Sequence, residues 1–186
     1  MRIIGITGSI ASGKTTVARL MAGKKYPLFS ADKTVSEFYK KEKFIKLLVK
    51  NFKLKKKDKI KNQIKSILQK NKKNIYKLEK IVHPLVRNEM KIFLKKKDKF
   101  IFLEIPLLVE SKLSKYFDKV IFVNTKKSIR LKRYLKKNLN KQTFNMLNSR
   151  QLLPAIKKKV CDYTINNNYS LAILKKNVKK FIINNE

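Results

Sequence analysis

The stretch Gly8-Ser-Ile-Ala-Ser-Gly13-Lys14-Thr15 matches the pattern G-x-x-x-x-G-K-[ST] of a phosphate-binding loop, or P-loop. It lies between an apolar run at residues 2–7 and a helix-like segment at residues 16–21, so a strand, a glycine turn and a helix are expected in that order. In such a loop the backbone N–H groups converge on a phosphate at the start of the helix. The stretch therefore predicts a nucleotide site in which Lys14 reaches the β- and γ-phosphate oxygens and Thr15 offers its hydroxyl to Mg²⁺.

The placement of glycine supports this interpretation. Three of the four glycines in the chain are Gly5, Gly8 and Gly13, and the last two occupy the glycine positions of the motif. At such positions a left-handed backbone or a close approach to another group excludes a side chain. The ATP-binding residues predicted from the loop are Ser9, Ile10, Ala11, Ser12, Gly13, Lys14, Thr15 and Thr16.

The length of 186 residues is about that of one α/β domain, so a second domain is expected only as an insertion. The first residues form a β-like run without the features of a signal peptide, and no apolar stretch approaches the roughly 20 residues of a membrane span. We therefore expect a cytoplasmic protein that does not bind a membrane. The lone cysteine, Cys161, excludes an intrachain disulfide and is interpreted as a small packing residue.

The formal charge is +36, from 48 basic and 12 acidic residues, and such a charge attracts nucleic acids. Only six of the basic residues are arginine, and the lysines are spread along the whole chain rather than along one stripe. We therefore expect no specific nucleic-acid partner. The clusters Lys55-Lys-Lys57, Lys95-Lys-Lys97 and Lys157-Lys-Lys159 are interpreted as solvated helix faces, which can still steer anionic substrates.

A change of pattern between about Lys33 and Lys99 indicates a helical insertion. Just before it, residues 26–30 form a short apolar run that predicts a second strand, with Asp32 at its C-terminal end, the edge where ligands bind in open α/β sheets. Within the insertion, apolar residues recur three or four positions apart and glycine is absent. Its turns are therefore expected at polar pairs, at Lys57-Asp58 and at residues 71–74.

The core resumes with a continuous apolar run at residues 100–103, which is typical of a strand buried on both faces and leads into residues 104–110. Strands separated by helical segments predict an α/β fold with a parallel, doubly wound sheet. The further elements expected are a strand at 119–123, a basic helix at 129–137, a polar turn at 138–141, more helix through Gln151, a strand at 162–165 and a C-terminal helix.

Carboxylates at the predicted strand ends are candidates for chemistry. Asp32 is either a base that deprotonates an acceptor hydroxyl, a group that holds Mg²⁺ through water, or the N-cap of the next helix. Glu104 and Glu110 flank the exit of the third strand, and each is either a metal-shell carboxylate or a structural cap. The pattern by itself does not choose between these roles.

The single histidine, His83, precedes Pro84 inside a helical pattern, and the residue before a proline is disfavoured in the α conformation. We therefore expect the helix to break or restart there, with His83 as a surface or capping residue. Arg130 and Arg133 lie three positions apart on the basic helix, so both are expected to face one side and reach phosphates.

Taken in order, these segments resemble the dephospho-CoA kinase family over nearly the whole chain. The P-loop alone indicates only an NTPase, whereas its combination with the His-Pro and Pro-Leu-Leu-x-Glu elements is specific to this family. The segments that carry the resemblance are Ile6-Thr-Gly-Ser-Ile-Ala-Ser-Gly-Lys-Thr15, Ala31-Asp32, Leu78-Glu-Lys-Ile-Val-His83-Pro84, Ile105-Pro-Leu-Leu-Val-Glu110 and Asp162-Tyr-Thr-Ile-Asn-Asn167. The resemblance implies a P-loop kinase fold with a core at 1–32 and 100–186, a helical substrate-binding insertion at about 33–99 and a helical lid at about 130–157.

The resemblance also implies an enzyme that uses ATP with Mg²⁺ to phosphorylate the ribose 3′-hydroxyl of dephospho-CoA, which gives coenzyme A and ADP. It implies that Asp32 takes the proton from that hydroxyl, while Lys14 and Thr15 handle the phosphates and Mg²⁺. Arg133 is then a lid arginine, and Asn167 lies near the adenine. The residues implied on the acceptor side are His83, Pro106, Leu107 and Glu110.

Several positions depart from the family pattern. Ser30-Ala31-Asp32 stands where Asp-Ala-Asp is usual, Lys137 stands where a second lid arginine is usual, and Asn166 and Glu104 each stand where the family usually has Asp. The nearest alternative function is another small P-loop kinase that acts on a nucleoside or a nucleoside monophosphate. A nucleic-acid-binding ATPase is a more distant alternative that rests on the net charge alone. The sequence does not determine the oligomeric state.

Overall fold

The computed structural model describes residues 1–54, 59–71 and 73–184. It divides into two compact units, which we call the core unit (Met1–Ser30 with Lys96–Glu186) and the helical unit (Ala31–Lys95). The lysine cluster at residues 55–57 and the turn expected at Lys57-Asp58 lie outside the described residues.

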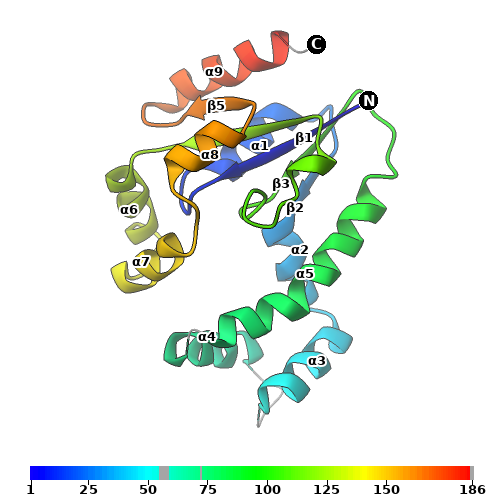
Figure 1. Ribbon diagram of the computed structural model, residues 1–186, viewed down its shortest axis with the longest axis vertical. Coiled ribbons are helices and arrows are strands. Elements are labelled where there is room, and N and C mark those ends of the chain that lie inside the picture. The colour runs from blue at the N-terminus through cyan, green and yellow to red at the C-terminus, as the bar shows by residue number, and fades with distance from the viewer. Residues whose placement is uncertain (55–58, 72, 185–186) are drawn as a thin grey trace. The chain divides into compact units, whose positions relative to one another are not determined.

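The core unit is built on a five-stranded parallel sheet with the strand order β2-β3-β1-β4-β5 (Figure 1). The central strand, β1, pairs with β3 on one side, where Ile6 is opposite Glu104, and with β4 on the other, where Gly8 is opposite Val123. The predicted α/β fold with a parallel sheet is therefore confirmed. The strands are β1 (Arg2–Gly8), β2 (Leu28–Ser30), β3 (Phe100–Glu104), β4 (Lys119–Asn124) and β5 (Tyr163–Asn166).

Burial explains why strands form where the apolar runs lie. All residues of β3 are buried, as is β1 from Ile4 to Gly8, so both strands have protein on each side. Two helices, α1 (Lys14–Ala22) and α9 (Leu171–Ile183), contribute to one hydrophobic cluster with these strands. Fully burying a single aliphatic side chain contributes about 1.5–3 kcal/mol, so this cluster holds the start of α1 firmly beside the end of β1.

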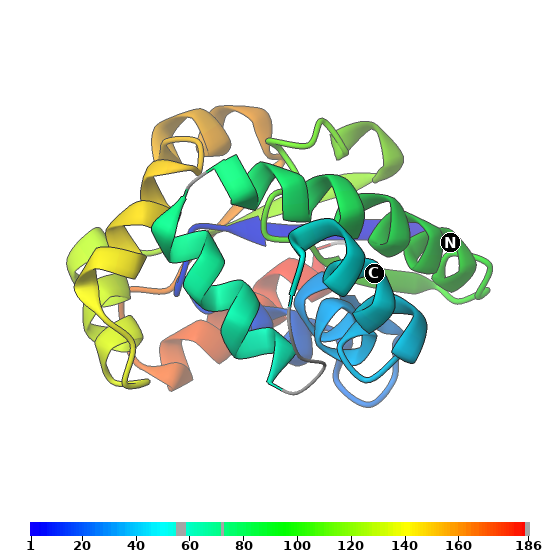
Figure 2. The same ribbon diagram turned by 90° about the horizontal axis from the view of Figure 1, so that it is seen from below.

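The C-terminal part of the core unit contains helices that the sequence located only in part. α6 (Lys127–Leu135) and α7 (Lys141–Ser149) lie side by side in both views (Figures 1 and 2). α8 (Pro154–Val160) was missed, because helix was expected only as far as Gln151. Its start does carry a signal, since proline is favoured in the first helical turn, where its missing N–H breaks no bond. A short 3-10 helix, η1, spans Ser114–Tyr116.

The helical unit packs around its own hydrophobic cluster, which includes Phe38, Leu48, Ile64 and Val82. α4 ends at Lys70 and α5 begins at Lys73, so the turn expected at residues 71–74 is only partly confirmed: Lys73 and Asn74 belong to α5, and residue 72 lies outside the described residues. Within residues 1–54, 59–71 and 73–184, no helix is both long enough and apolar enough to cross a bilayer. The helices of this unit are α2 (Ala31–Phe38), α3 (Glu42–Phe52), α4 (Ile60–Lys70) and α5 (Lys73–Phe93).

The helix break expected at His83 does not occur. α5 continues through Pro84, which lies inside the helix. The proline removes one backbone donor, but the helix buries Ile75 and Val82 before the proline and Met90 after it. This packing on both sides holds the helix together against a local cost of about 3 kcal/mol.

The interpretation of the lysine clusters as solvated helix faces is wrong in part for both clusters that the structure describes. Lys158 and Lys159 are exposed, whereas Lys157 is completely buried. Residues 95–97 are exposed, but they lie in the connection after α5 and not on a helix. The reason is that a repeated residue type cannot reveal which member of a run turns inward.

Cys161 is buried in the core unit, as expected for a packing residue. Desolvation by this burial raises the pKa of its thiol to about 11. The group is therefore a neutral thiol near pH 7 and not a nucleophilic thiolate.

Candidate active site

The P-loop has the backbone that phosphate binding requires. Gly13 has φ 90° and Ala11 has φ 58°, so the loop uses left-handed conformations at two positions. A Cβ on Gly13 would collide with the side-chain amide of Asn167, and one on Gly8 would lie 2.6 Å from Ser12 Oγ and 2.8 Å from the Val123 carbonyl oxygen. The geometric reason predicted for both glycines is thus confirmed.

The loop ends at the N-terminus of α1. No described side chain caps this helix at Gly13, and the first N–H groups of a helix have no acceptor within the helix. The side chain of Lys14 is 8 % exposed, and its Nζ donates to the carbonyl oxygen of Ser9 (3.1 Å), so the ammonium lies over the loop. Helix N-terminus and ammonium together form a cradle for a polyphosphate.

The carbonyl oxygen of Ser12 is a meeting point for side chains from distant parts of the chain. It accepts hydrogen bonds from Thr125 Oγ1 (2.9 Å), Asn167 Nδ2 (2.8 Å) and an Arg133 guanidinium nitrogen (3.4 Å). Arg133 also donates to the carbonyl oxygen of Asn167 (3.1 Å). The structure therefore brings two residues predicted to bind ATP, Arg133 and Asn167, directly onto the P-loop.

Arg130 differs from the expectation that both arginines of α6 reach phosphates. It is 2 % exposed, and its guanidinium donates to the carbonyl oxygens of Thr125 (3.1 Å) and Ile10 (3.3 Å) and to Asn148 Oδ1 (2.8 Å). Desolvation by burial lowers the pKa of this guanidinium from its usual value. The hydrogen bonds of Arg130 therefore go to protein acceptors, among them the P-loop carbonyl of Ile10, and not to the expected phosphates.

Glu104, at the end of β3, joins the P-loop to the end of β2. Its Oε1 accepts from Thr15 Oγ1 (2.6 Å), and its Oε2 accepts from Ser30 Oγ (3.0 Å). A carboxylate and a hydroxyl held together in this way are oxygen donors of the kind that Mg²⁺ prefers. The side chains at this strand end therefore fit a magnesium ion.

The turn after β3 contains three of the residues predicted for the acceptor side. The carbonyl oxygen of Pro106 accepts from Thr7 Oγ1 (3.0 Å), and that of Leu107 accepts from the Ser111 N–H (2.9 Å). Glu110 Oε1 accepts from the Leu152 N–H (3.0 Å) and pairs with Lys157 Nζ (2.7 Å). The turn is thus connected to the segment that precedes α8 and to α8 itself.

The other predicted residues belong to the helical unit. Asp32 is exposed in the first turn of α2, immediately after β2, so it is inside the helix and is not the N-cap. His83 is half-buried within α5. Asp32 therefore follows Ser30, the last residue of β2, by two positions along the chain.

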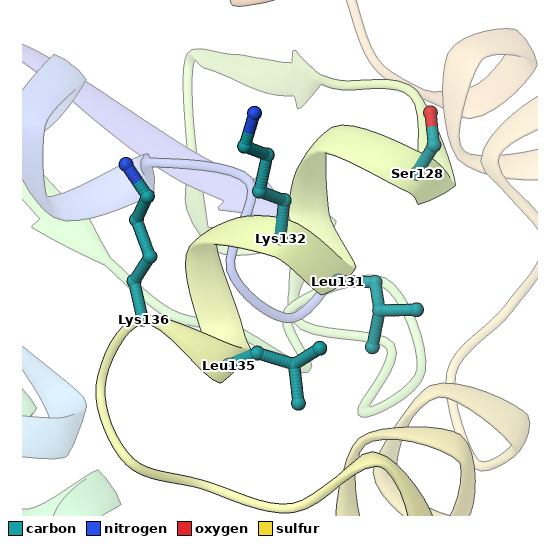
Figure 3. Close-up of a pocket in the computed structure, with 5 residues that line it drawn as sticks. All are labelled: Ser128, Leu131, Lys132, Leu135 and Lys136. Carbon is teal, nitrogen blue, oxygen red and sulfur yellow. The ribbon is translucent and has the colours of Figure 1, made fainter.

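α6 also has an outer face, which forms a hollow of about 510 Å³ lined by Ser128, Leu131, Lys132, Leu135 and Lys136 (Figure 3). Figure 3 shows the side chains of Lys132 and Lys136 pointing the same way and those of Leu131 and Leu135 pointing in another direction. These positions are three or four apart and so share a helix face that differs from the one carrying Arg130 and Arg133. The hollow is therefore separate from the contacts with the P-loop.

Sequence reasoning did not single out Gln151, Thr125 or Lys157. Thr125 and Lys157 are 4 % and 0 % exposed and bonded to site residues, and Gln151 Oε1 accepts from the Ile10 N–H (2.7 Å). Two weak sequence signals could have pointed to these residues: Gln151 is next to the apolar pair Leu152 and Leu153, and Thr125 directly follows a strand. Lys157 is hidden among its lysine neighbours and had no signal.

Comparison with known proteins found a matching family and several similar proteins. The family model described as dephospho-CoA kinase matches residues 2–172. A dephospho-CoA kinase from Bartonella henselae is 35 % identical over 172 residues, which cover 89 % of this chain and 88 % of the relative. A solved dephospho-CoA kinase from Campylobacter jejuni has a TM-score of 0.63 at 27 % identity, with 98 % of this chain and 96 % of that chain covered. A protein from Thermus thermophilus has a TM-score of 0.78 at 27 % identity, with 98 % and 97 % covered.

Proposed function

The chain belongs to the dephospho-CoA kinase family and is an ATP-dependent kinase that phosphorylates dephospho-CoA in coenzyme A biosynthesis, and from this premise we propose which of its residues carry the reaction. The observation that supports the assignment is the P-loop cradle, in which Lys14 and the uncapped N-terminus of α1 face the position of a polyphosphate. A kinase of this kind needs positioning and charge stabilisation more than covalent chemistry.

In the proposed reaction, the 3′-hydroxyl oxygen of the dephospho-CoA ribose attacks the γ-phosphorus of ATP. The bond between that phosphorus and the β–γ bridging oxygen breaks, and ADP leaves. Asp32 accepts the proton of the hydroxyl, because a carboxylate is a suitable general base. Lys14 and the first N–H groups of α1 stabilise the charge on the transferred group and on the leaving ADP.

Magnesium is proposed to bind where oxygen donors are already arranged. Thr15 and Glu104 would hold the ion, directly or through water, because their hydroxyl and carboxylate already lie together. When bound, Mg²⁺ neutralises phosphate charge. Glu104 also binds the hydroxyl of Ser30, so it connects this site to the position where the family usually has a further Asp.

The remaining predicted residues receive these roles. Arg133 and Asn167 are proposed to serve ATP binding from the side of Ser12, where both are bonded. The insertion at about 33–99, with His83, is proposed to bind the acceptor together with Pro106, Leu107 and Glu110. The segment at about 130–157 is proposed as the lid. A cytoplasmic location stays a prediction.

The function is tested by offering the purified protein Mg-ATP with dephospho-CoA, AMP, CMP or buffer alone, and measuring ADP release. We expect turnover with dephospho-CoA only, with coenzyme A identified by its mass. Preference for a nucleoside monophosphate would contradict the assignment to dephospho-CoA. Only the prediction of a P-loop kinase core would then remain valid. A variant is not needed for this test, because the three acceptors and the buffer without acceptor control for one another.

Replacing the P-loop lysine should separate chemistry from folding. Lys14→Met is expected to lower kcat by about 10²–10³-fold, since it removes the ammonium that stabilises the transferred phosphoryl group. The unfolding midpoint in urea is expected to stay near that of the wild type. The matched control is Lys24→Met, a solvent-exposed lysine just after α1, which should leave kcat unchanged. Retention of full activity in Lys14→Met would remove Lys14 from the mechanism.

A further inference from the structure

Both peptide groups of Ile10, the third residue of the P-loop motif, are bound by side chains from elsewhere in the core unit. The Ile10 N–H donates to Gln151 Oε1 (2.7 Å), and its carbonyl oxygen accepts from Arg130 (3.3 Å). These partners are 141 and 120 positions away along the chain. The peptide of a loop residue is therefore fixed by long-range contacts and not by its neighbours.

Those partners belong to one assembly. Arg130 lies on α6 and also donates to Asn148 at the end of α7, and its guanidinium lies 5.7 Å from the ring centre of Phe144 on α7. Gln151 follows α7 by two residues. We call α6, α7 and Gln151 the bracket. The bracket binds both the N–H and the carbonyl oxygen of Ile10, so two hydrogen bonds connect the P-loop to it.

The residue that follows Ile10 shows why this support matters. Ala11 has φ 58°, a left-handed conformation that is unfavourable for a residue other than glycine. Gly13 follows with φ 90°. Such conformations persist where the surroundings over-determine them. Ile10, whose N–H donates to Gln151, directly precedes these left-handed residues. A rotation of its peptide would change the direction of the loop N–H groups that must face phosphate.

We propose that Gln151 is a positioning residue for the nucleotide, which acts through the Ile10 N–H to keep the P-loop in its phosphate-receiving shape. The inference rests on the proposed use of the P-loop for ATP. Gln151 does not touch the reacting atoms. Its contribution falls on ATP affinity and not on binding of the acceptor, because its side chain accepts a hydrogen bond from the P-loop.

The test compares two Gln→Met variants. Gln151→Met keeps the length of the side chain and removes the amide acceptor, whereas Gln142→Met makes the same change at an exposed position of α7. Binding of Mg-ATP is measured at equilibrium without acceptor, and the KM for ATP and for dephospho-CoA is measured in turnover. We expect Gln151→Met to weaken ATP binding by about tenfold, the loss of one neutral hydrogen bond, and to leave the KM for dephospho-CoA within about twofold. Gln142→Met should match the wild type.

Two results would overturn the proposal: unchanged ATP affinity in Gln151→Met, or an equal rise in both KM values. If Gln151→Met does not fold, Gln151→Asn replaces it, because its shorter side chain withdraws the amide from Ile10; unchanged ATP affinity in that variant is equally decisive. Equilibrium ATP binding does not depend on the acceptor. A wild-type protein that binds ATP but ignores dephospho-CoA would therefore refute the proposed function and leave the inference on Gln151 testable.

Discussion

Asp32→Asn is expected to lower kcat by about two to four orders of magnitude, the usual contribution of a general base. Asparagine has nearly the same size and still accepts hydrogen bonds, but it cannot take the proton of the ribose hydroxyl. ATP affinity should be largely retained, because the P-loop and α1, which hold the phosphates, are unchanged. The measurement is steady-state turnover of dephospho-CoA together with equilibrium binding of Mg-ATP.

A control on the same helix separates the loss of the general base from the loss of one negative charge on α2. Glu37→Gln removes a negative charge from an exposed residue of α2 that pairs with Lys40 (2.9 Å), and it should leave kcat unchanged. If Asp32→Asn turned over dephospho-CoA as fast as the wild type, the base would have to be another group. A loss of ATP affinity equal to the loss of kcat would assign Asp32 to nucleotide binding instead.

Lys157→Met is expected to destabilise the fold by about 3–5 kcal/mol, the cost of leaving one partner of a buried ion pair uncompensated. The Lys157 side chain is fully buried and its Nζ lies 2.7 Å from Glu110 Oε1, so no water replaces the missing charge. Among the described residues, Glu110 Oε2 is already buried without a hydrogen-bond partner, so the carboxylate has little else to stabilise it. Urea unfolding measures the difference.

The neighbouring lysine supplies the control. Lys158→Met makes the same substitution at an exposed position of α8 and should change the free energy of unfolding by less than about 0.5 kcal/mol. The double variant Lys157→Met with Glu110→Leu should recover much of the stability, because removing both charges removes the desolvation cost. Equal stability of Lys157→Met and Lys158→Met would mean that the ion pair does not support the fold.

Much of the fold and part of the site could be predicted because their causes are local. The strand, glycine loop and helix around Gly8 and Gly13 follow from apolar periodicity and from backbone geometry that excludes side chains. The buried run at β3 follows from its unbroken apolar character. The course of α5 through Pro84 was mispredicted, since a local cost was outweighed by packing that no short pattern reveals.

The site divides in the same way. The sequence pointed to Lys14, Thr15, Arg133 and Asn167, because a motif or a family pattern marks each of them. The structure places Arg133 and Asn167 in contact with the P-loop. The sequence did not find Gln151, whose partner Ile10 is 141 positions away. The sequence also wrongly predicted that Lys157 is exposed. Lys157 and Lys158 are the same residue type and differ only in which side of α8 they occupy.

The sequence by itself therefore determined that this chain has a phosphate-binding loop between a buried strand and a helix, in a parallel α/β sheet of the dephospho-CoA kinase family. Only the tertiary structure decided that Arg130 and Gln151 hold Ile10, that Ser12 receives Thr125 and Asn167, and that Lys157 is buried against Glu110. The physical reason is range. Periodicity and backbone sterics act between neighbours along the chain, whereas hydrogen bonds and burial depend on which distant segments the fold brings together.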